Sequence, residues 1–294
     1  MGLIAQLLVN TLQIGAVYVL FSLGLTLVFG VMKVINFAHG QFFTLAALMI
    51  AVTMPEFTAR FGFPPWVDYF VCFGLAMLTV AALGVVLYFV GFERYLRDLI
   101  GSFILSVGLL LLLEGVYLWL FTGAPRVVPK LLTGEVSIFG GRLEAQRLVI
   151  CGIALAATAG LYWIVNHTKL GMALRAVSED REAAMLQGIR YRRISFYGFM
   201  IGSGLAAISG GLIAPLTAIS PSIGNDYLSK AFIIIIIGGL GSIPGAIVGG
   251  FLIAAIESFA GYFLDLSYAT IAMFVLVMVF LLVRPQGILG HAER

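Results

Sequence analysis

Residues 101–121, GSFILSVGLLLLLEGVYLWLF, carry a single charged side chain, Glu114, in a stretch of 21 residues. As an α-helix this stretch would be about 31 Å long, which matches the hydrocarbon core of a bilayer. The whole chain has the same character, since 61% of its 294 residues are hydrophobic and 11% are charged, whereas about a quarter of the residues in a soluble domain are charged. We therefore predict an all-α polytopic membrane protein, with one transmembrane domain over residues 1–294 and no separate globular domain.

Apolar windows of about 20 residues recur along the chain. The clear ones fall at about 6–29, 67–90, 101–121, 147–166, 194–219 and 267–283. Two further regions are apolar but interrupted: 34–54 begins with polar residues, and 231–264 contains LGSIPG between two apolar stretches. Because 231–264 is too long for one span, we interpret it as a helix, a break and a second helix that enter and leave on the same side. The pattern predicts about eight membrane segments, including the broken or re-entrant ones.

The placement of Lys and Arg predicts the orientation. If the loop at about 167–193 is cytoplasmic, eleven of the 17 basic residues lie inside and six outside, as the positive-inside rule requires. The inner ones are Lys33, Arg94, Arg97, Lys169, Arg175, Arg181, Arg190, Arg192, Arg193, Arg284 and Arg294, and the outer ones are Arg60, Arg126, Lys130, Arg142, Arg147 and Lys230. The N-terminus is then outside and the C-terminus inside. The external loop at about 122–146 contains VSIF among Pro and Gly residues, which suggests a short hairpin.

The internal loop has helical spacing. Leu174, Val177, Ala184 and Ile189 are apolar, and charged residues stand between them. Ser178 is expected to cap a helix that begins near residue 179, and Gly188 is expected to end it. The alternative is a solvated connector or a helix resting on lipid. The mixed charge favours a protein partner, because a helix that binds lipid would be mainly basic.

Several segments resemble a known family. GMALRAVSEDREAAMLQGI (171–189) is similar to the cytoplasmic coupling loop of ABC importer permeases, although only the E-A-A-x-x-x-G part of that motif is present. FGVMKVINFAHGQF (29–42), IGGLGSIPGAIVGG (237–250) and RPQGILG (284–290) resemble the branched-chain amino acid (Liv-type) ABC permeases, on their shorter subunit. The resemblance covers essentially the whole chain in the expected order.

The resemblance implies a multi-pass permease of the bacterial inner membrane. It would work with a second permease, often a different chain, with two cytoplasmic ATPases that hold ATP and magnesium, and with a periplasmic binding protein. The cargo would be a branched-chain or other hydrophobic amino acid, or a related small amide. The candidate ATPase-coupling residues are Arg175, Glu179, Asp180, Glu182, Ala183, Ala184 and Gly188.

Catalysis by this chain itself is not expected. The sequence lacks the phosphate-binding motif G-x-x-x-x-G-K-[ST], so ATP would be hydrolysed by the partners. An intramembrane enzyme would need a nucleophile and a base at one depth, whereas His39, His167 and His291 fall at different predicted levels. Cys72 and Cys151 lie in apolar runs and indicate neither a disulfide nor a metal site. We expect no bound cofactor and no nucleic-acid partner.

The substrate path is expected at the two broken segments, because irregular backbone at membrane depth survives only where protein or a water-filled cavity satisfies it. The candidate path residues are Asn36, His39, Gly40, Gly238, Gly239, Gly241, Gly245 and Glu257. Asn36 and His39 have an alternative, purely structural role, in which they lie near the cytoplasmic interface beside Lys33 and cap a helix.

Two carboxylates, Glu114 and Glu257, fall inside predicted spans, where ionised groups are costly. With no Lys or Arg expected at the same depth, they support a rival class, an ion-coupled secondary transporter. Small residues from Gly198 to Ala214 recur at every fourth position, and we expect this stripe to pack against other helices of the same chain.

Overall fold

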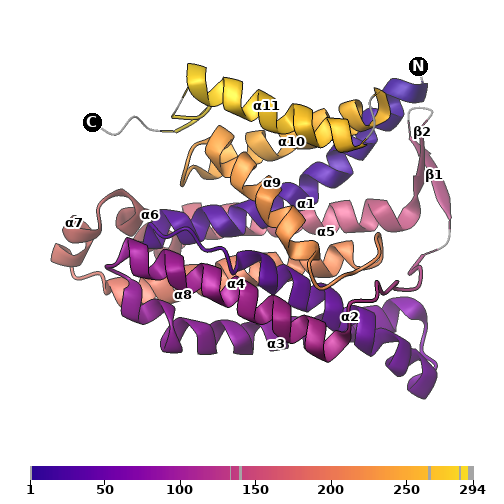
Figure 1. Cartoon of the computed structure of the whole chain (residues 1–294), viewed down its shortest axis with the longest axis horizontal. Coiled ribbons are helices and arrows are strands. Elements are labelled where there is room, and N and C mark those ends of the chain that lie inside the picture. The colour runs from indigo at the N-terminus through magenta and orange to yellow at the C-terminus, as the bar shows by residue number, and fades with distance from the viewer. Residues whose placement is uncertain (1, 133, 139–140, 264–265, 285, 291–294) are drawn as a thin grey trace.

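The computed structural model describes residues 2–132, 134–138, 141–263, 266–284 and 286–290. Phe139, Pro285, His291 and Arg294 lie outside this part of the chain. The helices are α1 (Gly2–Met32), α2 (His39–Phe61), α3 (Pro65–Val90), the 3-10 helix η1 (Phe92–Tyr95), α4 (Leu99–Phe121), α5 (Ala145–His167), α6 (Lys169–Glu179), α7 (Arg181–Leu186), α8 (Tyr191–Ile213), α9 (Ile223–Gly238), α10 (Ile243–Phe263) and α11 (Leu266–Val283). The strands β1 (Glu135–Ile138) and β2 (Gly141–Glu144) pair antiparallel, which confirms the expected hairpin (Figure 1).

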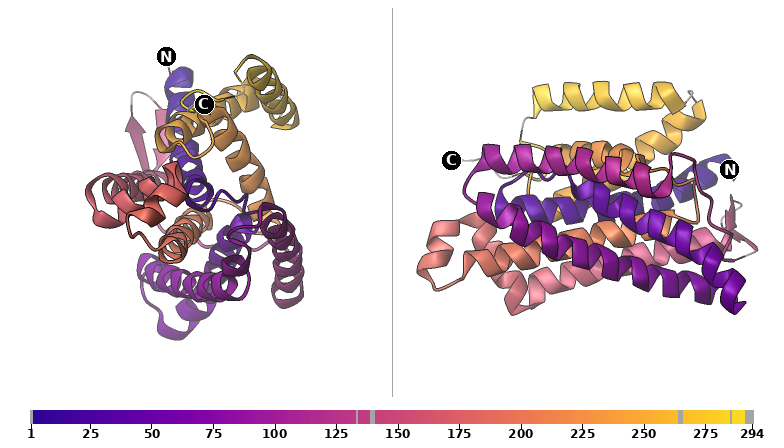
Figure 2. Two further views of the ribbon diagram at one scale, coloured as in Figure 1. Left: turned by 90° about the vertical axis from the view of Figure 1, so that its left-hand side faces the viewer. Right: turned by 60° about the horizontal axis from the view of Figure 1, so that its bottom comes forward.

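Seven helices of the described chain, α1 to α5, α8 and α10, are long and apolar enough to cross a membrane. The apolar helix α11 has 18 residues and lies at the edge of the bundle, which the left-hand view of Figure 2 shows end-on. The fold confirms the predicted all-α polytopic membrane protein.

Helix α1 lies in the middle of the bundle, between α8 and α10 (Figure 1). Small residues permit the close packing: a Cβ atom on Gly202 would lie 2.8 Å from the Gly24 carbonyl oxygen, and one on Gly250 would lie 2.5 Å from the Val19 side chain. Gly210, another member of the α8 stripe, contacts the backbone of Phe43 on α2. These contacts confirm that the stripe packs against helices of the same chain.

Helices α2 and α9 both begin deep in the bundle. His39 opens α2 and places its Nε2 atom 3.3 Å from the carbonyl oxygen of Phe21, which lies eleven residues before the end of α1, a rise of about 16 Å. Helix α9 starts at the same level, where the backbone of Gly224 contacts that of Gly40. With 16 residues, α9 spans only part of the bundle.

The glycine-rich turn after α9 lies at the end of the bundle rather than at the membrane depth that the sequence suggested. Gly241 is adjacent to Gly30, near the end of α1 where Lys33 follows. Helix α10 then runs back antiparallel to α1, and Ser258 donates a hydrogen bond to the Leu7 carbonyl oxygen at the far end. Helices α9 and α10 therefore form a hairpin whose tip reaches the Lys33 end.

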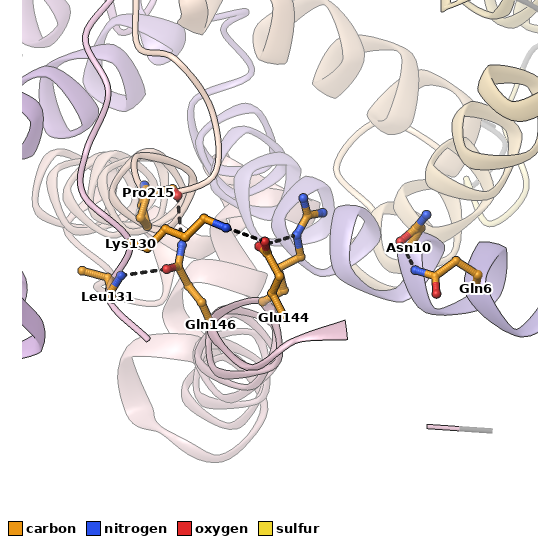
Figure 3. A network of polar contacts seen from close by, with 8 residues as sticks. Gln6, Asn10, Lys130, Leu131, Glu144, Gln146 and Pro215 are labelled. Atoms are coloured by element: carbon orange, nitrogen blue, oxygen red, sulfur yellow. Dashed lines mark hydrogen bonds and ion pairs between the residues drawn. The ribbon is translucent and has the colours of Figure 1, made fainter. Parts of the chain in front are cut away.

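The loop between α4 and α5 covers the opposite end (Figure 1), and Figure 3 shows polar contacts that hold it. Buried Gln146 accepts a hydrogen bond from the backbone N–H of Leu131 and donates one to the carbonyl oxygen of Pro215. Arg126 exchanges two backbone hydrogen bonds with Ile219. On the surface Lys130 donates to Glu144, and this hydrogen bond lowers the pKa of the carboxyl. The loop is thereby attached to the segment 214–222 that leads into α9.

Candidate functional site

The first half of α9 carries polar side chains at membrane depth. Asp226 and Ser229 are exposed, and Asn225 is half-buried. A carboxylate on a helix in this position cannot face hydrocarbon at low cost, so it has to face water or a partner protein. Figure 1 shows α9 at the front of the bundle beside α4. We call Asn225, Asp226 and Ser229 the polar face of α9.

A chain of hydrogen bonds joins this polar face to α2 and α4. The Nε2 atom of Gln41 donates to Asn225 Oδ1 over 3.2 Å, and the Nδ2 atom of Asn225 donates to Glu114 Oε2 over 3.0 Å. The hydroxyl of Tyr117 donates to the Gln41 carbonyl oxygen. Gln41 itself is fully buried, and its Oε1 atom has no partner among the described residues. Gln41 therefore holds Asn225 from behind the polar face.

The first turns of α2 and α9 meet behind this face. Each helix start carries partial positive charge and backbone N–H groups that lack helical acceptors. The Gly224 N–H is already satisfied by the Thr44 hydroxyl over 3.0 Å. A carboxylate near these helix starts would be stabilised, and an ammonium group would be stabilised by Asp226 or Glu114. The polar face therefore has complementary groups for both charges of a zwitterion.

Aromatic rings lie next to the polar face, towards the Lys33 end. Phe232 follows Ser229 by one turn of α9, and its ring centroid lies 4.8 Å from that of Phe37. Phe37 in turn makes an edge-on contact with Phe103 of α4. These rings supply an apolar surface beside the charged groups, which suits an amphipathic solute.

Glu257 of α10 forms an ion pair with a lysine of α9. Lys230 Nζ lies 2.6 Å from Glu257 Oε1, and the hydroxyl of Tyr18 donates to Glu257 Oε2 over 2.7 Å. Lys230 also lies 5.1 Å from the centre of the Tyr18 ring. Two expectations are wrong: Lys230 lies within α9 rather than in an outer loop, and Glu257 has a basic partner. The pair connects α1, α9 and α10, which favours a structural role for Glu257.

The other sequence-predicted path residues at the first break are packed behind the polar face. Asn36 accepts a hydrogen bond from the backbone N–H of Ala38 over 3.0 Å and so orders the turn before α2. Asn36 and His39 are buried, and Gly40 contacts α9. The hydrogen bond of Asn36 is compatible with its structural alternative, and His39 lies deeper in the bundle than Lys33.

The glycines of the second break serve the turn at the Lys33 end. The backbones of Gly238 and Gly245 touch, and Gly239 packs on Gly290 of the C-terminal segment. The backbone N–H groups of Ile288 and Leu289 donate to the last carbonyls of α9, at 2.7 and 3.1 Å. The C-terminal segment therefore satisfies the end of α9, whose carbonyls would otherwise lack partners.

The polar face itself is not among the site residues that the sequence predicts. Residues 220–230 carry several polar groups before the apolar run, and the outer placement predicted for Lys230 puts them in an external loop. One signal was available: Asn225 and Ser229 are spaced by four residues, as are Asp226 and Lys230. On a helix that spacing gives two separate polar stripes.

The predicted coupling element consists of two short helices. Thr168 caps α6, since the backbone N–H of Gly171 donates to its hydroxyl. Asp180 caps α7 by accepting from Glu182 and Ala183 at 2.8 and 3.0 Å. The expected cap at Ser178 is wrong, because Ser178 lies in the last turn of α6. A carboxylate at 180 competes better for the free N–H groups of α7.

Helix α7 projects past the ends of the long helices, as Figure 1 and the right-hand view of Figure 2 show. Its tip carries Leu186, which is 87% exposed, whereas Ala184 is buried against the rest of the protein. Gly188 follows with a φ of 82°, a conformation that other residues adopt only under strain. Glu182 and Ala183 are exposed as the coupling prediction requires.

A cavity of about 830 Å³ lies behind α6, at the Lys33 end of the bundle. Arg175 and Glu179 of the predicted coupling set line it together with Lys33 and Gly241. The structure thus brings part of the coupling element next to the tip of the α9–α10 hairpin. Between them lies Gly30 of α1, where a Cβ atom would be 3.8 Å from Ser178 of α6 and 3.9 Å from Gly241.

A multi-span protein with a polar helix face at membrane depth, and a capped helix that projects from one end, has the features of a transport permease. Residues 7–283 match the family model described as branched-chain amino acid transport system / permease component. The chain therefore belongs to this permease family, whose members are permease subunits of ABC importers, and it is a multi-pass protein of the inner membrane.

Individual relatives match over nearly their whole length. The high-affinity branched-chain amino acid transport system permease protein BraD of Pseudomonas aeruginosa is 31% identical, over 98% of this chain and 96% of that protein. LivH of Escherichia coli K12 is 30% identical over the same shares, and the probable LivH of Methanocaldococcus jannaschii is 28% identical over 92% of this chain and 88% of that protein. No solved structure matches.

Proposed function

We propose that this chain forms part of the import path for branched-chain or other hydrophobic amino acids, or for related small amides. The relatives are permeases of high-affinity branched-chain amino acid transport systems. The path runs along the polar face of α9, where Asp226 attracts the ammonium group and the converging helix starts attract the carboxylate. The Phe37 and Phe232 rings accept the apolar side chain.

The observation that supports this path is the exposed carboxylate of Asp226 on a helix at membrane depth. A second permease subunit would complete the path by covering the polar face. Glu114 and Asn225, which are hydrogen-bonded to each other, lie at its edge. Whether the second subunit is a copy of this chain or a different one does not alter this role for α9.

The energy comes from two cytoplasmic ATPases that dock on α7, with their own ATP and magnesium. Closure of the ATPases displaces α7 and α6, and the movement passes to the α9–α10 hairpin through the contacts at the Lys33 end. This arrangement sets α7 and the C-terminus inside and the N-terminus outside. Without Lys230 on the outer side, the basic residues divide eleven to five, which strengthens the same orientation.

The test is ATP-driven uptake of leucine by the complete transporter in proteoliposomes, with its ATPases and binding protein. Asp226→Asn is expected to reduce uptake at least tenfold while the complex still assembles. Glu56→Gln, which removes an exposed carboxylate near the end of α2, is the matched control and should transport normally. Equal uptake by both variants would refute the path. Uptake driven by a proton gradient in this chain alone would instead favour the secondary transporter.

A further inference from the structure

A cavity of about 950 Å³ opens between the end of α3, η1, α7 and the start of α8. It lies at the same end of the bundle as α7, and it is separate from the polar face of α9. Met185 and Ile189 border it on the α7 side. Tyr88 and Phe89 of α3 face it from one wall, and Phe196 and Tyr197 of α8 face it from another.

The rim of this cavity is strongly basic. Five arginines line it, and all five are exposed: Arg94, Arg97, Arg190, Arg192 and Arg193. The only carboxylate in the lining is Glu93, which lies 2.8 Å from the Arg192 guanidinium. Within the described chain the other four arginines have no carboxylate in ion-pair contact. Such a group of guanidinium forks suits a phosphate, which each fork can bind through two hydrogen bonds.

The wall of the cavity is apolar and belongs to the spanning helices. Phe89 is 50% exposed and Tyr197 is 46% exposed, although both lie within helices long enough to cross a membrane. A soluble protein docked beneath the membrane could reach the arginines but not these rings. An amphipathic ligand with a phosphate at the rim and a hydrocarbon chain along the rings would contact both.

We propose that this cavity binds an anionic phospholipid of the inner leaflet, with its headgroup phosphate among the arginines and an acyl chain against Phe89 and Phe196. Basic pockets between spanning helices on the cytoplasmic side favour such headgroups. The inference rests on the cavity and its lining, and it does not depend on which solute the permease carries.

The bound lipid would stiffen the element that faces the ATPases. Around the cavity, Arg181 donates to the Leu96 carbonyl oxygen and lies 4.8 Å from the centre of the Tyr191 ring. The hydroxyl of Tyr88 donates to the Arg192 carbonyl oxygen over 2.8 Å. These contacts join α3 and the turn after η1 to α7 and the start of α8. A lipid in the cavity adds a further connection between the same segments, so anionic lipid is expected to increase the coupling of ATP hydrolysis to uptake.

The test measures lipid binding directly. The complete transporter is purified in mild detergent, and native mass spectrometry counts phosphatidylglycerol and phosphatidylcholine retained after exposure to equal amounts of each. The wild-type complex should retain more phosphatidylglycerol than phosphatidylcholine. In Arg97→Gln/Arg193→Gln the affinity for phosphatidylglycerol should fall about fivefold for each arginine removed. The control Arg60→Gln/Arg284→Gln removes two exposed arginines elsewhere and should retain the lipid normally.

Two further arms identify the source of the phosphate and the competing occupant. Phe89→Ala should weaken retention of phosphatidylglycerol, whereas inorganic phosphate alone should neither displace the lipid nor raise the melting temperature as the lipid does. Equal retention of phosphatidylglycerol in wild type and the arginine variant overturns the proposal. A rise in melting temperature with inorganic phosphate equal to the rise with the lipid also overturns it. If the arginine variant loses the ATPases but keeps its phosphatidylglycerol, the cavity is part of a protein interface and the proposal fails.

Discussion

Gly40 and Gly224 lie in direct backbone contact, so that α2 and α9 begin at one level inside the bundle. A Cβ atom on Gly40 would lie 2.7 Å from the Gly224 carbonyl oxygen, a separation that side chains do not adopt. Since α2 leads away from this level towards one end and α9 towards the other, their starts form a junction across the middle of the protein. The Gln41 and Asn225 side chains that connect α2 to the polar face follow directly after these two glycines.

Gly224→Ala should therefore disrupt the junction. The new methyl group would collide with the Gly40 backbone and with the Thr44 hydroxyl, neither of which can move without displacing α2. Overpacking of this kind costs about 1–3 kcal/mol. We expect a lower melting temperature of the purified complex. Uptake should fall by a larger factor than the amount of folded complex recovered.

Gly108→Ala is the matched control for this substitution, because a Cβ atom there meets nothing within 4 Å. It lies on α4, at a position where alanine also has the higher helix propensity. An unchanged melting temperature in both variants would mean that the junction tolerates displacement, contrary to the packing argument.

The Lys230–Glu257 pair predicts a non-additive effect on stability. Replacing Glu257 with Met leaves a lysine without its counter-ion in a largely buried position. The loss is about 3–5 kcal/mol for a fully buried pair and smaller for this one, since the Lys230 side chain keeps 22% of its surface exposed. Lys230→Met together with Glu257→Met removes both charges and should recover most of the lost stability. The measurement is a double-mutant cycle on the melting temperature. Strict additivity would show that the two residues do not stabilise each other.

Much of the fold follows from the sequence, because membrane spans are the strongest signal that a chain carries. The stretch 101–121 falls within α4 and 147–166 within α5, and the small-residue stripe of α8 is packed as expected. The depth at which each break lies in the bundle does not follow from the sequence. Gly241 and His39 lie in similar apolar contexts, yet one is at the end of the bundle and the other inside it, since tertiary contacts with α1 decide the level.

The candidate site was harder to predict for a related reason. Lys230 and Asp226 have the composition of a loop, and hydropathy alone assigns such residues to water. They lie instead one turn apart on a short helix, where Lys230 is paired with Glu257 and Asp226 is exposed. The cost of burying Lys230 is offset by a partner from α10, 27 residues away, and no local pattern contains that information.

Asn225→Asp should make transport depend on pH. The substitution sets a second carboxylate at about the 3.0 Å separation that now holds an amide–carboxylate hydrogen bond to Glu114. Two carboxylates at this distance repel each other when both are ionised. At low pH they share a proton and the link persists, whereas at higher pH both ionise and separate. Uptake should therefore fall with rising pH in the variant and not in wild type.

The double variant Glu114→Gln/Asn225→Asp provides the control for this pH dependence. It restores one amide and one carboxylate at the same two positions with their order exchanged. Its uptake should lose the pH dependence of the single variant, provided that the measurements use proteoliposomes with a fixed internal pH. A pH profile in the double variant equal to that of Asn225→Asp would place the titrating group elsewhere.

Leu186 and Gly188 allow docking and coupling to be separated. Leu186 is the exposed apolar side chain at the tip of α7, so Leu186→Asp should reduce the ATPase content of the purified complex. Met172→Asp on α6 removes another exposed apolar side chain and should leave the ATPases bound, which makes it the matched control.

Gly188→Val acts differently, because the φ of 82° at this position is strained for a β-branched residue by about 1–3 kcal/mol. The helix would then lose its fixed orientation while its tip stays intact. We expect the Gly188→Val complex to retain its ATPases and hydrolyse ATP, with uptake per ATP reduced several-fold. Normal uptake per ATP in this variant, with ATPases bound to Leu186→Asp, would exclude α7 as the coupling element.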